Sequence, residues 1–235
     1  MWRSRLAAVA LLSVMAGAGQ VVLPSGALAS PPDPATGRSQ GTLSKGKVRP
    51  GPDTLVFSTA QSQFDPGIYN QGWWSERNPN DDANDNYVVG PLEGEYRNFF
   101  TFDVSALNKK HVTSATLRVN TASVTLLNGS EVLKLSDVST DTATLNENSG
   151  TNPEIFSDLG TGAVYGTFSV SAVGNDQQLS LELNKVALHD LKHASKHAPD
   201  GFFSVGGSLL NAGLEYEYLF GNSGHLPVEL VVHTR

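Results

Sequence analysis

The chain has 235 residues, of which 17% are charged and 39% hydrophobic, so it can bury the core of one domain and carry a tail. Its 23 glycines and 12 prolines are typical of a turn-rich globular protein rather than a coiled coil or a disordered chain. Because it contains no cysteine, the composition excludes a disulfide framework, a thiol nucleophile, a Cys-ligated zinc site and an iron–sulfur cluster.

Residues 1–29 have the pattern of an export signal. Arg3 and Arg5 precede an apolar stretch at residues 6–18. Ala27 and Ala29, separated by one residue, then form a cleavage site with small side chains. The apolar stretch is shorter than the ~20 residues of a membrane span, which favours a cleaved signal peptide over a retained signal anchor. We therefore expect a secreted, extracellular protein (periplasmic in a cell with two membranes) that is not inserted in a membrane after cleavage.

The segment after the signal, residues 30–50, is rich in Pro, Gly and Ser, which predicts a disordered tail because it has few apolar side chains to bury. Residues 51–235 contain 10 Lys and Arg against 22 Asp and Glu, a net charge of −12. So acidic a domain repels nucleic acid and anionic membrane surfaces. The basic tail either contacts an anionic cell wall or is a solvated spacer.

From residue 54 onward, apolar residues recur in short runs bounded by Gly, Asn, Asp and Pro, which is typical of strands. In chain order, the predicted strands cover residues 55–57, 98–104, 112–121, 131–135, 164–170, 178–183, 202–205, 214–220 and 228–233. Residues 184–197 predict a short helix that begins at Asn184 as its cap. The sequence therefore predicts a single jelly-roll-like antiparallel β-sandwich over residues 51–235, with one short helix.

Two adjacent segments of the predicted sandwich carry a family pattern. Residues 97–107 read RNFFTFDVSAL and residues 112–119 read VTSATLRV, while residues 86–90, NYVVG, precede them. These segments resemble the signature of DNRLRE-type modules, secreted bacterial β-sandwiches in which an Arg precedes an FD-containing strand. The resemblance implies a β-sandwich similar at fold level to carbohydrate-binding modules. Fold alone does not determine function.

Three aromatic side chains, Tyr69, Trp73 and Trp74, precede an acidic loop. Sugar rings stack their C–H faces on aromatic planes, so these residues are candidate glycan-binding residues. In an extended segment the two tryptophan side chains point to opposite sides. We expect one of them to be buried and the other to be exposed. A packing role for the whole group is the alternative interpretation.

The loop that follows contains Asp81, Asp82, Asn84, Asp85 and Asn86. Calcium binds six to eight oxygen ligands, and carboxylate and amide side chains at this density can supply them. An EF-hand is excluded because a tyrosine stands where that loop needs glycine, and no flanking helices are predicted. These five residues are therefore candidate ligands of a Ca²⁺ ion. The alternative is a solvated loop in which Asn and Asp stabilise turns.

His189, His193 and His197 are spaced four residues apart and form one stripe along the predicted helix. A pair of histidines with this spacing can chelate Zn²⁺. Three side chains from one helix cannot surround a metal ion without ligands from elsewhere in the chain. We therefore favour a solvated helix face for this stripe.

Paired carboxylates would be needed for glycoside hydrolysis, and Glu215 and Glu217 form such a pair on one face of a predicted strand. Solubility of an edge strand is the more common reason for this pattern.

Arg97 and Asp103 are six residues apart, which places them on the same side of their strand. We interpret these two residues as a buried structural ion pair.

Three functions remain open from the sequence. The first is a secreted, non-catalytic module that binds a glycan or another component of the cell envelope. The second is a secreted polysaccharide hydrolase or lyase that uses paired carboxylates. The third is a structural surface protein without a small ligand. The sequence does not determine the ligand or the oligomeric state.

Overall fold

The computed structural model describes residues 53–60, 70–81, 84, 86–171, 173–196, 201–211, 213, 216–222 and 227–235. The predicted signal peptide and tail lie outside these residues. Five residues discussed above also lie outside them: Tyr69, Asp82, Asp85, His197 and Glu215. In the described part of the chain, no helix is both long enough and apolar enough to cross a membrane.

Strands dominate the described residues, among which eleven strands and three short α-helices are found. The strands are β1 (Asp53–Ser58), β2 (Gln71–Ser75), β3 (Tyr87–Pro91), β4 (Glu95–Asp103), β5 (Val112–Thr125), β6 (Glu131–Asp137), β7 (Val164–Val170), β8 (Gly174–Glu182), β9 (Phe202–Leu209), β10 (Tyr218–Gly221) and β11 (Glu229–Thr234). The helices are α1 (Thr142–Asn146), α2 (Pro153–Thr161) and α3 (Lys185–Ala194), with a short 3-10 turn at Ser105–Leu107.

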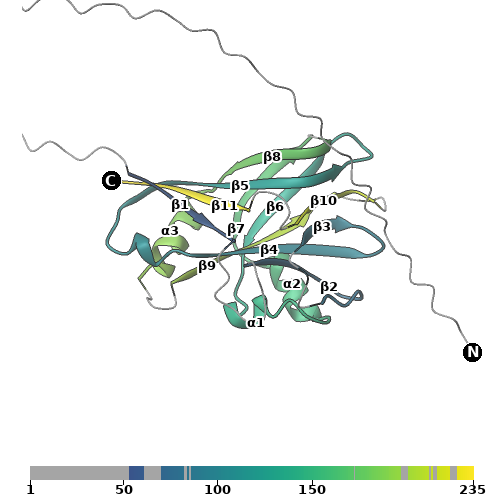
Figure 1. Cartoon of the computed structure of the whole chain (residues 1–235), viewed down its shortest axis with the longest axis horizontal. Helices are drawn as coiled ribbons and strands as arrows, with labels where there is room; N and C mark the ends of the chain where they lie inside the picture. The colour runs from purple at the N-terminus through teal and green to yellow at the C-terminus, as the bar shows by residue number, and fades with distance from the viewer. Residues whose placement is uncertain are drawn as a thin grey trace, which may run out of the picture. The chain divides into compact units, whose positions relative to one another are not determined.

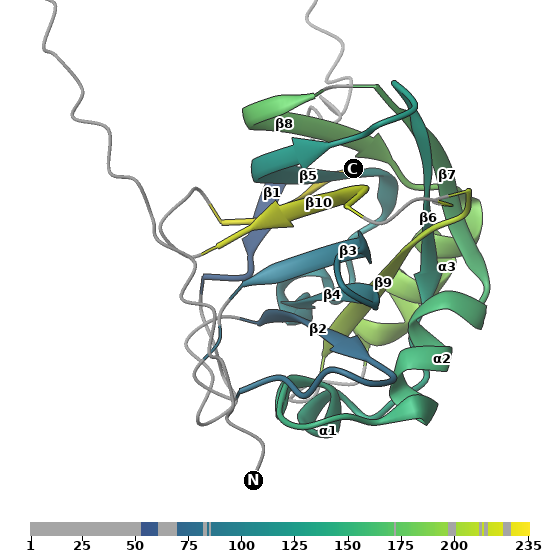
Figure 2. The same cartoon turned by 90° about the vertical axis from the view of Figure 1, so that its right-hand side faces the viewer.

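All strand pairs are antiparallel, and they build two sheets that continue into each other (Figures 1 and 2). In the first sheet β8 pairs with one edge of β5, β11 and β10 share the other edge, and β1 pairs with β11. The second sheet has the order β2-β4-β9-β6-β7. Strand β3 pairs with both β10 and β4 and so joins the two sheets. This topology confirms the predicted antiparallel β-sandwich.

The main core lies between the two sheets. Successive side chains of a strand point to opposite faces, so every second residue of a strand faces this core. Its large side chains include Phe100, Phe102, Leu117, Leu133 and Leu135, each at most 3% exposed. Burying one such side chain contributes about 1.5–3 kcal/mol, and the main core therefore supplies most of the apolar stabilisation.

A second, smaller core lies on the outer face of β2 and β4, under α1 and α2 (Figure 2). It consists of Trp74, Phe99, Leu145, Ile155, Phe156 and Leu159. Helix α2 begins after Asn152, whose side chain accepts hydrogen bonds from the first free amides of the helix. A Cβ on Gly206 of β9 would lie 2.6 Å from the carbonyl oxygen of Leu159, so glycine is required for α2 to approach β9 this closely.

Helix α3 confirms the helix predicted at residues 184–197. The Asn184 side chain accepts hydrogen bonds from the amides of Val186 and Ala187, at 2.9 and 3.2 Å, as an N-cap does. Ala187 and Leu191 are buried in the main core. The expectation of a single helix was wrong, because α1 and α2 also form, and the predicted strands did not include β2 or β3. Helices α1 and α2 and strand β2 are short, and packing of the second core stabilises them.

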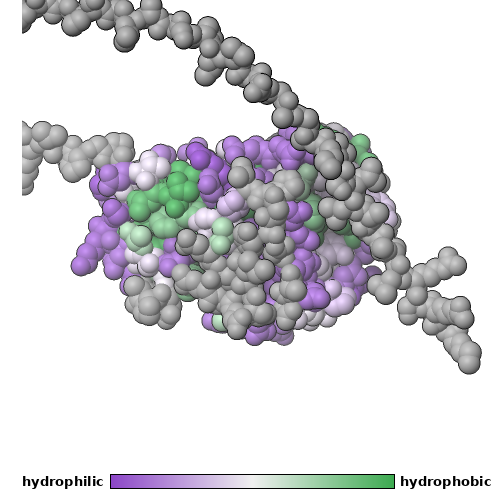
Figure 3. Space-filling model, in the orientation of Figure 1, coloured by the Kyte–Doolittle hydropathy of each residue, from purple (hydrophilic) through white to green (hydrophobic). Residues whose placement is uncertain are grey.

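Among the residues that Figure 3 colours, hydrophilic ones predominate, and hydrophobic ones gather at the left over β1. Strand β1 contributes Val56, which is 52% exposed. The polar remainder of this face agrees with the acidic composition of the domain.

Candidate functional site

The candidate site is a pocket of about 430 Å³ between α3 and strands β6, β7 and β9, here called the α3 pocket. It is lined by Asp137, Val138, Tyr165, Asp190, His193, Ala194, Phe202, Phe203 and Ser204. Aromatic rings and acidic groups from four elements thus meet in one cavity. Its size lies within the range usual for small-ligand sites.

Tyr165 is directed into the pocket by an irregularity of β7. The pairing of β6 with β7 shifts at one point, because Leu135 pairs with Gly166 while Ser136 pairs with Val164. Tyr165 is therefore the extra residue of a β-bulge, and bulges often redirect a side chain beside a functional site. Its ring is fully buried and stacks on Phe203, with centroids 5.4 Å apart and an interplanar angle of 20°.

Two carboxylates meet at the Tyr165 hydroxyl. The hydroxyl lies 2.8 Å from Asp137 Oδ1, at the end of β6, and 3.2 Å from Asp190 Oδ2, in the middle of α3. A phenol has one hydrogen, so it donates to one carboxylate at a time. Given these two distances to one hydroxyl oxygen, the two carboxylate oxygens are at most about 6 Å apart, so they form a close carboxylate pair.

The electrostatics of the pocket keep Tyr165 protonated. Burial first, and then the negative charges of Asp137 and Asp190 with their hydrogen bonds, raise the pKa of the Tyr165 phenol well above its ordinary value near 10. The hydroxyl is therefore a hydrogen-bond donor at every physiological pH. It links β6 to α3 and holds the two acidic side chains toward the same point.

The histidine stripe reaches the edge of this pocket. His189 is 79% exposed, and its Nδ1 lies 2.9 Å from Asp190 Oδ1. His193 is exposed and lines the α3 pocket. Both described histidines of the stripe are thus on a solvated face, as favoured from the sequence. Among the described residues, no group of three or more His, Asp or Glu side chains is arranged to hold a metal ion.

The two tryptophans of β2 do point to opposite faces, as predicted, but neither is exposed. Trp74 is 2% exposed and donates from Nε1 to the carbonyl oxygen of Leu145 at 3.1 Å. Trp73 is 8% exposed and meets Tyr96 edge-on, with ring centroids 4.8 Å apart. The prediction that one ring is exposed for sugar stacking was therefore wrong, because β2 pairs with β4 and α1 and α2 cover its outer face.

Two asparagine side chains in and beside the predicted calcium loop accept hydrogen bonds from neighbouring groups of the chain. Asn80 Oδ1 accepts from the amide of Asp81 and from Asn84 Nδ2, at 2.9 and 3.0 Å. Asn84 Oδ1 accepts from the amide of Asn86 at 3.0 Å. These bonds are those of an amide-stabilised turn. Because Asp82 and Asp85 lie outside the described residues, calcium binding by this loop stays a prediction.

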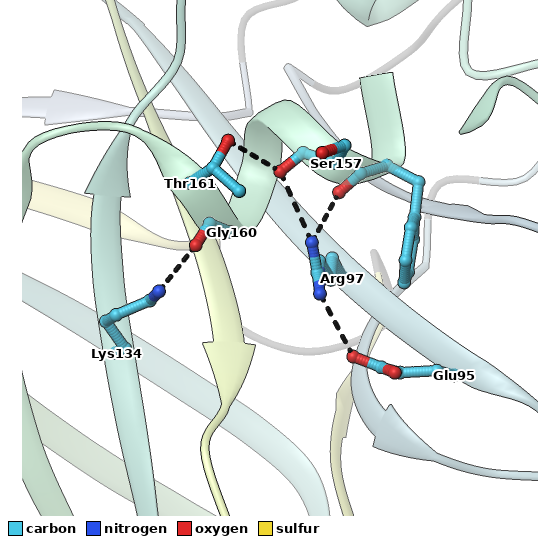
Figure 4. A network of polar contacts seen from close by, with 7 residues as sticks. Glu95, Arg97, Lys134, Ser157, Gly160 and Thr161 are labelled. Atoms are coloured by element: carbon cyan, nitrogen blue, oxygen red, sulfur yellow. Dashed lines mark hydrogen bonds and ion pairs between the residues drawn. The ribbon is translucent and has the colours of Figure 1, made fainter. Parts of the chain in front are cut away.

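Arg97 and Asp103 do not form the predicted ion pair. Six residues of a strand span about 20 Å, so two side chains at this spacing share a face without touching. Arg97 instead stacks on the Phe156 ring at 4.1 Å and donates to the carbonyl oxygen of Phe156 at 2.9 Å (Figure 4). It also pairs with Glu95 at 3.3 Å. Asp103 accepts from the amide of Ser105 at 3.0 Å.

Arg97 therefore fastens α2 to β4. Lys134 of β6 donates to the carbonyl oxygen of Gly160 in the same helix (Figure 4). Arg97 thus contacts a carbonyl group in the middle of α2, whereas Lys134 contacts one in the last turn, where the helix dipole favours positive charge. This arrangement explains both residues structurally.

A larger pocket of about 640 Å³ lies beside α2, and its lining contains two acidic residues, the exposed Glu154 and Asp158. Asp158 accepts four hydrogen bonds from the amide and hydroxyl groups of Ser139 and Thr140. Burial opposes ionisation of Asp158, but these bonds outweigh it and lower the pKa of this carboxyl. This carboxylate therefore has a structural role, and we do not place the site here.

Asp137, Tyr165 and Asp190 were not singled out from the sequence. The three residues have no characteristic spacing, and the nearest signal was the position of Asp190 beside the histidine stripe. Comparison with known protein families and with curated proteins finds no match to this chain. The resemblance to DNRLRE-type modules therefore stays a prediction.

Proposed function

We propose that this protein is a secreted, non-catalytic module that binds a glycan or another hydroxyl-rich component of the cell envelope, with the α3 pocket as its ligand site. The observation that carries this proposal is the convergence of Asp137 and Asp190 on the Tyr165 hydroxyl inside an aromatic-lined pocket. Secretion follows from the signal-like sequence of residues 1–29.

Carboxylates fixed in this way suit hydroxyl groups of a ligand. An ionised carboxylate has about four lone-pair sites and only accepts hydrogen bonds, so Asp137 and Asp190 can bind donors beyond Tyr165. Hydrogen bonds to ionised groups are about twice as strong as neutral ones. The half-buried Phe202 adds an aromatic group beside these acceptors. A sugar presents hydroxyl donors and apolar C–H faces, and both match this lining.

A polysaccharide hydrolase is the second candidate, because Asp137 and Asp190 form a close carboxylate pair and glycosidases use two carboxylates. We rank it below binding for a geometric reason. The Tyr165 hydroxyl stands between the two carboxylates, in the space that the scissile bond of a substrate would have to enter. A Ca²⁺ ion in the loop of residues 81–86 would be compatible with either function.

A glycan array followed by calorimetric titration tests the proposal, with reducing-sugar release measured on the same samples. Asp190→Asn should abolish glycan binding, whereas the matched control Glu154→Gln, an exposed acid in α2, should bind like the wild type. Binding that survives Asp190→Asn would exclude the α3 pocket. Sugar release by the wild type that is lost in Asp190→Asn would favour the hydrolase. Absence of both binding and release would favour a structural surface protein.

A further inference from the structure

Two buried carboxylates lie beside the turn between β5 and β6, at the end of β6 away from the α3 pocket. Glu131 begins β6, the strand that Asp137 of the pocket ends. Glu131 shares its face of the strand with Leu133 and Leu135, which lie in the main core, so its side chain points between the sheets. Glu217 directly precedes β10 of the other sheet. The two glutamates are only 4% and 0% exposed.

Both glutamates adjoin the turn between β5 and β6. Glu217 Oε1 accepts hydrogen bonds from the amides of Leu127 and Asn128 in this turn, at 3.0 and 3.1 Å. Glu131 is the first strand residue after the same turn. The two amides orient the Glu217 carboxylate and leave its second oxygen, Oε2, for another partner.

That second oxygen has no hydrogen-bond partner, and neither has Glu131 Oε2, although both atoms are buried. Among the described residues, the ion pairs involve other acids, so no lysine or arginine there neutralises these two glutamates. Burial first, and then the charge of Glu217, raise the pKa of the Glu131 carboxyl. An unpaired buried charge is strongly destabilising, and two of the same sign also repel each other.

We propose that Glu131 and Glu217 bind a Ca²⁺ ion at the β5–β6 turn, each through its free Oε2. The ligands are carboxylate oxygens, which suit a hard cation such as Ca²⁺ better than a softer metal such as zinc. Two carboxylates balance the charge of one divalent cation. Calcium completes its coordination with backbone carbonyl groups and water at such sites. This site is separate from the loop of residues 81–86, and it would fasten the two sheets together independently of any glycan.

Thermal unfolding of the full chain, freed of metal with a chelator and titrated with Ca²⁺, tests the proposal without glycan. At a hundredfold excess over Kd, the wild-type melting temperature should rise by roughly 5–10 °C. Glu131→Gln and Glu217→Gln should each lose this rise, and the exposed control Glu154→Gln should keep it. Without Ca²⁺, Glu131→Gln should melt at or above the temperature of the wild type, because it removes the repulsion.

Calorimetric titration of Ca²⁺ into the folded protein measures binding directly. If Glu217→Gln does not fold, the comparison of the wild type with Glu131→Gln decides whether Ca²⁺ binds at this site. No Ca²⁺ heat with the wild type, or equal heat with wild type and Glu131→Gln, would overturn the proposal. A rise that persists in Glu131→Gln but is lost in Asp82→Asn would assign the ion to the loop of residues 81–86 instead. Stability that depends on pH but not on Ca²⁺ would mean that the two carboxylates share a proton.

Discussion

Replacing Tyr165 with phenylalanine isolates the interaction on which the α3 pocket depends. The substitution removes one oxygen and keeps the buried ring and its stacking on Phe203, so no cavity forms. What is lost is the hydroxyl contact at 2.8 Å to Asp137 and at 3.2 Å to Asp190. A hydrogen bond to an ionised group contributes about 1.5–3 kcal/mol. For a domain of this size we expect the melting temperature to fall by roughly 3–10 °C.

Tyr87→Phe is the matched control. Tyr87 is also buried in the main core, but its hydroxyl donates to a neutral acceptor, the carbonyl oxygen of Asn120, at 2.9 Å. A neutral hydrogen bond contributes about 0.5–1.5 kcal/mol, so this variant should lose less stability. Denaturant titration gives both free energies of unfolding. If Tyr165→Phe cost no more than Tyr87→Phe, the hydroxyl would not be bound to ionised carboxylates and our reasoning about the pocket would be wrong.

The stability difference between the wild type and Tyr165→Phe has a defined pH dependence. The folded-state pKa of Tyr165 is raised, so its contribution to stability is fully present below the unfolded pKa near 10 and is lost as pH rises beyond it. The difference in stability between the wild type and Tyr165→Phe should therefore be constant from pH 7 to about 9 and should narrow above pH 10. A difference that instead changed near neutral pH would point to another titrating group.

Three further predictions concern other parts of the structure. Gly206→Ala should lower the free energy of unfolding by about 1–3 kcal/mol, because its Cβ would collide with the backbone of Leu159; a circular-dichroism melt at the wild-type temperature would contradict this. Trp74→Ala should cost about 3–5 kcal/mol by emptying the second core, as measured by denaturant titration, and any loss of glycan binding should follow unfolding. In calcium-free protein, the raised pKa of Glu131 predicts that the contribution of this residue to stability is fully present below about pH 4 and is lost as pH rises through the folded pKa, so the difference in melting temperature between the wild type and Glu131→Gln should change over this range in melts at each pH.

Most of the strands and helix α3 were predictable because their signals are local. Strand β5 alternates Ala115, Leu117 and Val119 toward the core, and a period of two residues is visible in the sequence alone. Asn184 caps α3 through a bond to amides two and three residues ahead. Helix α2 carried the same kind of signal, since Asn152 is followed by a proline at the first helical position, and it could have been found.

The tertiary structure decided which side chains are exposed and which residues they contact. The tryptophan pair was predicted to have one exposed ring, but the pairing of β2 with β4 and the cover of α1 and α2 leave both rings buried. Arg97 was correctly placed on one face of its strand, yet its partners come from α2, about 60 residues further along the chain.

The sequence by itself determined the compartment expected for the chain, the acidic charge of the domain and the two-residue alternation that makes a sandwich. Only the tertiary structure decided where its carboxylates meet. Tyr165 lies 28 and 25 residues from its two aspartates, and Glu217 lies 90 residues from the amide it binds at Leu127. Secondary structure depends on neighbours a few residues apart, whereas these sites depend on which strands pair. Strand pairing brings together residues that are far apart in the sequence, and their separation does not indicate that they will meet.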